Sequence, residues 1–377
     1  MLYSIIAKIL VFYPILIVID RFFTKFGALM IYVELFISVG IIILKNKKNI
    51  IKYFFIIIIF LFSFFFTTNF KLHLEYIRNL MISFAVFDIC LDRDILKLLK
   101  KEMIKSKRIL FFGILLNFFI NIVLFFSSKG YSSLYSEAWG TRAFNGIYVD
   151  PHQLAYRTIA ILMLSLFYIR IMSNKKEKKI LIGLSIIGCL FILMSGARVP
   201  LILAAIIELY ILKSLNIKFT NTNLNTKEKI FLMTILLLIC IVAIILLSKT
   251  AFWKKNINSL NNLSFDNGRS ALQKIDIEYF KNLNIINKLF GIGNEKSYEL
   301  HMRKFAAYIW SHNDFTQILN GNGIILLIIY IYSLFNLRKI EMENKSLFMI
   351  SIFFVVWKNG LYVHTSVVFS FIALAIS

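Results

Sequence analysis

The stretch ILFFGILLNFFINIVLFFS, residues 109–127, contains no charged side chain. A helix needs roughly 20 apolar residues to cross the hydrocarbon core of a membrane, and its backbone polar groups must be satisfied inside the segment. The stretch also lacks the alternating pattern of a barrel strand. It therefore predicts a membrane-spanning helix.

The rest of the chain extends this pattern. Of its 377 residues 59% are hydrophobic, with 38 Phe and only 3 Pro, whereas soluble domains are about 45–50% apolar. We expect an all-α integral membrane protein, a single polytopic domain over 1–377 with about 12 transmembrane helices. These spans are expected at 2–19, 27–44, 53–68, 75–91, 109–127, 151–172, 180–196, 199–213, 229–248, 314–336, 347–359 and 360–376.

The formal net charge of +23 would suit a nucleic-acid-binding protein, but the basic residues lie mainly in short connections between the expected spans. Connections after even-numbered spans carry most of them, including the dense group from Arg93 to Arg108. Lys and Arg are enriched in the short cytoplasmic loops of membrane proteins. The asymmetry predicts a multi-pass protein of the cell (inner or cytoplasmic) membrane with both termini cytoplasmic. Its partner is then the lipid bilayer, with no role for nucleic acid.

The same topology places loop 128–150, the larger loop 249–311 and the turn at 195–198 on the outer face. Loop 249–311 is polar and charged and carries FDNGRS (265–270) and LFGIGN (289–294), and WSHNDF (310–315) follows at its end. Such a loop is typical of a protein that handles a substrate at the membrane surface. The three cysteines lie in apolar runs without metal-ligand spacing, so we expect packing roles for them and no metal site.

The first outer segment is WGTRAFNGIYVDPHQLA (139–155). Asp150 before Pro151 is a good helix start, because the carboxylate accepts orphan N–H groups and proline presets φ. Asp150 is therefore either a plain helix cap or a substrate-binding residue. His152 lies in the first turn. Arg157 lies deeper, where it either extends outward to water or serves a function, as ionisable residues at that depth often do.

The second segment, MSGARVP (194–200), holds Arg198 at the expected membrane surface. Arg198 is either an interfacial anchor or a phosphate clamp, since guanidinium offers planar, bidentate donors and a permanent charge. In the third segment, Asn267-Gly268 reads as a turn, and the apolar spacing predicts a short helix over 270–280. Arg269 then lies beside N-terminal amides, a combination that favours an anion.

His312 precedes another expected helix, next to Ser311, Asn313 and Asp314. A lone histidine is usually structural, but these neighbours can orient its ring. Imidazole, with a pKa near 6.5, suits general base catalysis at neutral pH. The chain contains no Walker A loop, HExxH or GxSxG motif, so ATP hydrolysis and the common hydrolase chemistries have no support.

At these segments the chain resembles the O-antigen polymerase/ligase family of bacterial envelope glycosyltransferases, over roughly residues 128–336. The matching pieces are GTRAFNG, DPHQLA, SGAR, NGRS, LFGIGN and SHNDFTQILNGNG, in that order. Family members often have asparagine in place of His152 and serine in place of Ala197.

The resemblance implies a C-type glycosyltransferase-like fold with a helical outer-face loop. It implies transfer of glycan from polyprenyl pyrophosphate to an acceptor sugar hydroxyl, with no cofactor and no metal. Arg198 and Arg269 would hold the pyrophosphate, and His312 would take or orient the hydroxyl proton. The substrate-binding residues would be Arg142, Asp150, His152, Arg157 and Asn313.

The function expected from this resemblance is polymerisation of surface polysaccharide repeat units, such as O-antigen, capsule or exopolysaccharide. Its partners would be a polyprenyl-pyrophosphate-linked oligosaccharide, a chain-length regulator and a flippase. One alternative is ligase-type transfer of a finished glycan to a lipid, protein or wall acceptor. A second is a polysaccharide flippase or transporter, since about twelve spans and a basic inner face also fit that class.

Overall fold

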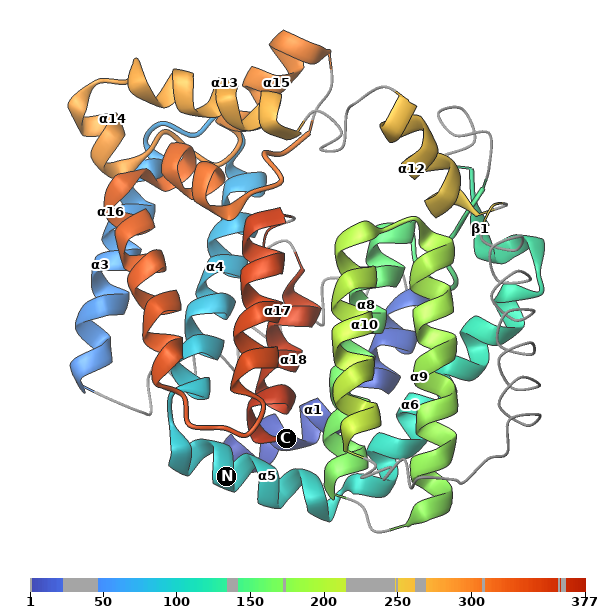
Figure 1. Ribbon diagram of the computed structural model, residues 1–377. Coiled ribbons are helices and arrows are strands. Elements are labelled where there is room, and N and C mark those ends of the chain that lie inside the picture. The colour runs from blue at the N-terminus through green and yellow to red at the C-terminus, as the bar shows by residue number, and fades with distance from the viewer. Residues whose placement is uncertain are drawn as a thin grey trace, which may run out of the picture. The chain divides into compact units, whose positions relative to one another are not determined.

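The computed structural model of the chain describes residues 2–22, 47–133, 142–171, 174–214, 248, 250–261, 269–306, 309–358, 360 and 364–377. These residues fold almost entirely into helices (Figure 1), which confirms the all-α prediction. Among them the one sheet is a short antiparallel hairpin of β1 (Tyr131–Ser132) and β2 (Ala143–Phe144) in loop 128–150. The predicted spans at 27–44 and, apart from residue 248, at 229–248 lie outside the described residues.

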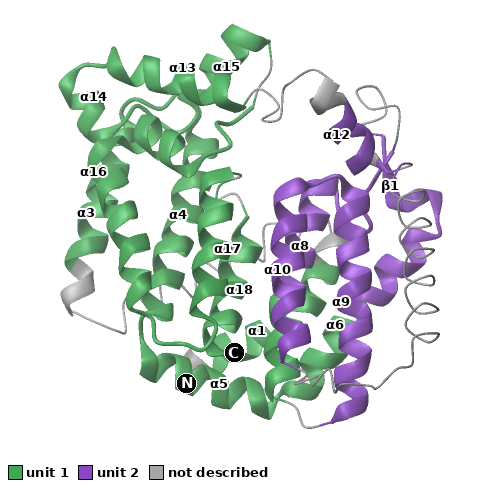
Figure 2. Ribbon diagram, viewed as in Figure 1, with its two compact units in different colours: residues 1–117, 163–171, 266–377 green, residues 118–162, 172–265 purple. Residues whose placement is uncertain are grey.

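The chain divides into two compact units (Figure 2). Unit 1 comprises residues 1–117, 163–171 and 266–377, and unit 2 comprises 118–162 and 172–265. The single membrane domain expected over residues 1–377 stays a prediction. The helices of unit 1 are α1 (Leu2–Phe22), α3 (Lys47–Phe64), α4 (Phe70–Cys90), α5 (Arg93–Lys105), α13 (Arg269–Lys281), α14 (Ile285–Phe290), α15 (Lys296–Phe305), α16 (Asp314–Asn336), η3 (Leu337–Lys339), α17 (Lys345–Lys358) and α18 (Thr365–Ile376). Those of unit 2 are η2 (Ser128–Gly130), α9 (Lys175–Ser195), α10 (Arg198–Lys213) and α12 (Ala251–Asn261). Residues of α6 (Lys107–Phe125) and α8 (Pro151–Ile171) belong to both units.

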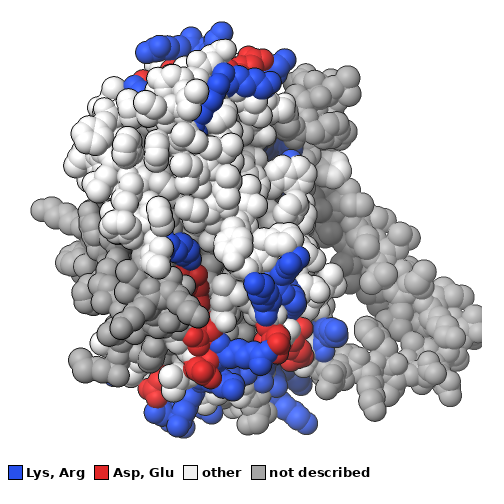
Figure 3. All heavy atoms as spheres, turned by 90° about the vertical axis from the view of Figure 1, so that its left-hand side faces the viewer, with Lys and Arg blue, Asp and Glu red and all other residues white. Residues whose placement is uncertain are grey.

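Four elements within the described residues are long and apolar enough to cross a membrane: Lys107–Phe125, Pro151–Ile171, Lys175–Ser195 and Asp314–Lys339. They coincide with predicted spans 109–127, 151–172, 180–196 and 314–336. On the face drawn in Figure 3, a broad uncharged band separates charged residues at the two ends. Within that band lipid can replace water without leaving charges unsolvated. The apolar helices thus indicate a membrane protein, and the count of about twelve spans stays a prediction.

Helix α5 lies in the basic connection between the predicted spans 75–91 and 109–127, where no helix is predicted. Asp92 caps it, accepting hydrogen bonds from the N–H groups of Asp94 and Ile95. Its apolar side, which includes Leu99 and Met103, is buried, while its lysines are exposed. Helix α5 packs against α1, α4 and α18. It is therefore an amphipathic helix, and it lies across one end of unit 1 (Figure 1).

The other end of unit 1 is covered by α13, α14 and α15, which come from loop 249–311 (Figure 1). The short helix predicted over 270–280 is confirmed as α13, which begins at Arg269. All three helices contact α16, and α14 also contacts α3. The part of the loop in unit 1 is thus a layer of packed helices.

Helix α16 is bent near its first turns. Gly323 lies inside it with φ 80° and ψ 176°, a non-helical conformation. The Tyr330 hydroxyl donates a hydrogen bond of 2.7 Å to the Asp314 carboxylate. In a straight helix residues sixteen apart are separated by about 24 Å, so the contact requires the chain to fold back at Gly323. The sequence predicted the helix over 314–336 but not this bend.

Candidate functional site

Two motifs from the sequence analysis, LFGIGN (289–294) and NGNG (320–323), contact each other through their main chains. The N–H of Ile292 donates to the carbonyl of Asn320, and the N–H of Gly293 donates to that of Gly321, both at 3.0 Å. Carbonyls at a helix end lack partners within the helix. The bend in α16 releases these carbonyls, and the GIGN turn satisfies them.

Glycine is required at this crossing because the backbones approach too closely for a side chain. A Cβ on Gly291 would lie 2.3 Å from the carbonyl oxygen of Gly321, and one on Gly323 would lie 2.2 Å from that of Leu289. Both glycines have positive φ, 84° and 80°, a region that side-chain-bearing residues rarely adopt. The glycine spacing of the two motifs therefore has a packing cause.

His73 of α4 anchors this crossing. The N–H of Asn294 donates to its Nδ1 at 3.2 Å, which assigns the ring proton to Nε2, 2.9 Å from the Ser63 hydroxyl. That hydroxyl in turn donates to the carbonyl of Phe60. Burial lowers the pKa of His73 to about 4, so the ring is neutral at pH 7. With its proton on Nε2, this histidine cannot act as a base toward Ser63, and the pair is structural.

A buried pair of a histidine and a carboxylate joins α13 to α15. Nε2 of His301 lies 3.3 Å from Oδ1 of Asp276, and both side chains are fully buried. Nδ1 of His301 lies 2.7 Å from the carbonyl oxygen of Ile309. Burial lowers the pKa of His301, but Asp276 and this carbonyl raise it more, so the net pKa is raised above its ordinary value. The Asn320 amide donates to the carbonyl of Asp276, which ties the pair to α16.

Arg269 and Asn313 meet at the carboxyl end of α17. Nη1 of Arg269 donates to the carbonyl of Lys358 at 2.8 Å, and Nδ2 of Asn313 donates to the carbonyl of Trp357 at 3.2 Å. A cation is favoured there by the helix dipole. Asn313 also caps α16, since its Oδ1 accepts from two backbone N–H groups. The Asn313 side chain, predicted to contact the substrate, is therefore already engaged in three hydrogen bonds within the protein.

His312 lies beside this junction in a constrained turn. Its φ is 53°, in the left-handed region, and its ring centroid is 4.7 Å from that of Trp310. Hydrogen bonds fix the residues on both sides of it. The Ser311 hydroxyl donates to Gln317 at 2.8 Å, and the Asn313 amide donates to the carbonyl of Trp357. The half-buried imidazole thus has a defined position close to the end of α17 that Arg269 contacts.

Arg198 lies in unit 2, at the start of α10. Helix α9 ends at Gly196 with φ 74°, and α10 begins two residues later. Nη2 of Arg198 donates to the carbonyl of Lys255 in α12 at 3.3 Å. The 195–198 turn therefore contacts a helix of loop 249–311. Like Arg269, this half-buried arginine binds a main-chain carbonyl.

The first segment also lies in unit 2. Oδ1 of Asp150 accepts from the N–H of Gln153 at 2.9 Å, so Asp150 caps α8. The guanidinium of Arg157 lies 5.2 Å from the ring centroid of Tyr148. His152 is half-buried in the first turn, and Arg142 is exposed just before β2.

The structure therefore brings Arg269, His312 and Asn313 together in unit 1, whereas the remaining predicted site residues belong to unit 2. Sequence reasoning missed the buried pair of Asp276 and His301. It also missed the contact of His73 with the GIGN turn. The sequence does carry a signal for the crossing of the two motifs, because GIG (291–293) and GNG (321–323) are two glycine pairs with the same spacing. Within the described residues no group of three His, Cys, Asp or Glu residues is arranged to hold a metal ion.

No protein-family model matches the chain, and no curated protein matches it significantly.

Proposed function

We propose that the chain is a membrane glycosyltransferase that polymerises surface polysaccharide repeat units. In this proposal it has about twelve spans, a C-type glycosyltransferase-like fold and cytoplasmic termini. It transfers glycan from polyprenyl pyrophosphate to an acceptor sugar hydroxyl on the outer face of the membrane.

One observation carries the proposal: Arg269 and the turn holding His312 are fixed at the same helix end. Arg269 and Asn313 bind the successive carbonyls of Lys358 and Trp357. A cation that can bind phosphate and an imidazole that can accept a proton thus come from distant parts of the sequence to one place. This pairing supports transfer of a glycan from a donor whose leaving group is anionic, because the cation stabilises the charge that develops on that group.

In the proposed reaction the acceptor oxygen attacks the anomeric carbon of the donor glycan. A new C–O bond forms, and the bond from that carbon to pyrophosphate breaks. The bonding electrons leave with the pyrophosphate, whose developing charge Arg198 and Arg269 stabilise. The hydroxyl proton passes to His312. Arg142, His152 and Arg157 contact the substrate, while Asp150 and Asn313 act as positioning residues through the helices that they cap.

The arginines are tested by reconstituting the protein with purified lipid-linked oligosaccharide and measuring polymer formation. Arg198→Ala and Arg269→Ala should each reduce turnover by about 100-fold or more, as loss of one transition-state donor does elsewhere. If both bind one pyrophosphate, the double variant should lose less than the product of the two effects, since residues sharing a partner are not additive. Arg303→Ala, an exposed arginine of α15, is the control and should keep full activity. Normal polymer from either single variant would refute the pyrophosphate assignment.

His312 is tested separately from donor binding. His312→Ala should lose turnover yet still bind labelled lipid-linked donor, because its proposed role begins after the donor is held. His312→Gln should behave in the same way, since an amide cannot accept the proton at neutral pH. Full turnover in either variant would remove His312 from the mechanism.

The bend at Gly323 favours a flippase or transporter as the second candidate, because discontinuous helices frame the substrate sites of many transporters. The same reconstitution separates the classes. Longer glycan identifies a polymerase, glycan on a new acceptor identifies a ligase, and movement across the bilayer without bond formation identifies a flippase.

A further inference from the structure

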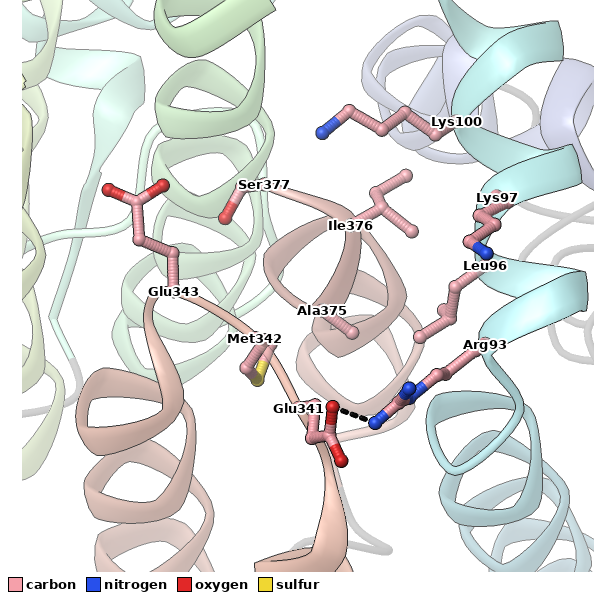
Figure 4. Close-up of a pocket in the computed structure, with 10 residues that line it drawn as sticks. All are labelled: Arg93, Leu96, Lys97, Lys100, Glu341, Met342, Glu343, Ala375, Ile376 and Ser377. Carbon is pink, nitrogen blue, oxygen red and sulfur yellow. Dashed lines mark ion pairs between the residues drawn. The ribbon is translucent and has the colours of Figure 1, made fainter.

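A pocket of about 380 Å³ lies at the end of unit 1 opposite the loop helices, between α5, the connection preceding α17 and the end of α18 (Figure 4). Its α5 wall carries Arg93, Lys97 and Lys100. Their spacing of four and three residues puts them on one side of the helix. The pocket has the size of sites that bind small ligands.

The charges of the pocket divide into paired and unpaired groups. Glu341 forms an ion pair with Arg93, and Glu343 lies 3.1 Å from the guanidinium of Arg170. Both acids that line the pocket are thereby neutralised. Among the described residues neither Lys97 nor Lys100 forms an ion pair, so the pocket keeps two exposed positive charges. An anion entering it would meet these lysines without displacing an existing pair.

Apart from Ser377, the remaining walls are apolar. Leu96, Met342, Ala375 and Ile376 line the pocket beside the lysines. On the outer surface of α5, Leu98 is 46% exposed and Ile104 is 37% exposed. Apolar side chains flanked by lysines are typical of helices that lie in the membrane interface. The pocket therefore suits a ligand that has an anionic part next to an apolar part.

We propose that this pocket binds the phosphate group of an anionic phospholipid, with Lys97 and Lys100 contacting the phosphate and the apolar wall contacting the adjoining glycerol and first methylenes. Basic pockets beside membrane helices recognise lipid headgroups in this way. The proposal does not depend on the glycosyltransferase assignment.

The test uses the purified full chain in detergent, with binding of phosphatidylglycerol and phosphatidylcholine measured by native mass spectrometry. Wild type should bind phosphatidylglycerol at least about tenfold more tightly than phosphatidylcholine. The double variant Lys97→Ala with Lys100→Ala should lose most of this preference, because each lysine contributes about fivefold. Lys97→Arg with Lys100→Arg should retain it, which also shows that the wall tolerates substitution.

The charge-matched control is Lys101→Ala with Lys105→Ala, because both are exposed on the same helix and neither lines the pocket. This control should keep the preference for phosphatidylglycerol. An equal loss of the preference for phosphatidylglycerol in both double variants would overturn the proposal, because general surface charge would then explain the binding. Calorimetry with inorganic phosphate, on the protein in phosphatidylcholine nanodiscs, tests whether the pocket binds free phosphate instead of a lipid headgroup. If inorganic phosphate binds with the same lysine dependence while phosphatidylglycerol shows no preference, the lipid assignment is refuted.

Discussion

Replacing Gly323 by alanine tests the crossing between the bent helix α16 and the GIGN turn. Gly323 has φ 80° and ψ 176°, and its added Cβ would lie 2.2 Å from the Leu289 carbonyl oxygen. The atom in the way belongs to the backbone, so no side-chain rotation relieves the clash. The variant must hold alanine in a strained backbone conformation and also move the two segments apart.

The expected loss in the free energy of unfolding is the sum of these two costs. Holding alanine in a conformation almost restricted to glycine costs about 1–3 kcal/mol. Separating the segments breaks the hydrogen bonds from Ile292 to Asn320 and from Gly293 to Gly321, which together contribute about 1–3 kcal/mol. Gly323→Ala should therefore lower the free energy of unfolding by about 2–6 kcal/mol because both costs apply.

The assay is unfolding of the purified protein in mixed micelles with increasing SDS, followed by circular dichroism. Gly183→Ala is the matched control, because Gly183 lies in helix α9 and nothing lies within 4 Å of its added Cβ. That substitution should stabilise the protein by about 0.5–1 kcal/mol through helix propensity. A Gly323→Ala variant as stable as wild type would refute the crossing.

Two further predictions concern individual contacts. The pKa of His301 is raised above 6.5 in the folded protein, so its pairing with Asp276 should stabilise the fold fully below pH 6.5 and lose this effect as pH rises through the folded-state pKa. SDS unfolding at several pH values should show this decline in wild type and a flatter profile in His301→Gln; parallel profiles would contradict it. Asp150→Ala should cost about 1 kcal/mol because α8 loses its cap, whereas Asp150→Asn should keep both stability and polymer formation in reconstitution. An Asn variant that is stable but inactive would instead indicate a role for the Asp150 charge in substrate binding.

The positions of many helices follow from the sequence, because hydropathy and cap chemistry act over a few neighbouring residues. The apolar run at 109–127 predicts α6, and apolar spacing predicts α13 almost to the residue. Asp150 before Pro151 marks the start of α8. The basic charge of residues 93–108 does not by itself indicate α5, whose buried side follows from the apolar spacing of the same residues.

The candidate site is less predictable because its contacts join distant segments. The hydrogen bond between His73 and Asn294 links positions 221 residues apart, and no local periodicity encodes such a pair. Arg269 and Asn313 were recognisable as polar residues at helix starts, but only the folded chain places both on the end of α17. The sequence alone therefore determined a helical membrane chain with a long polar loop. The tertiary structure decided that α16 bends at Gly323, because the bend depends on a backbone crossing with the distant GIGN turn.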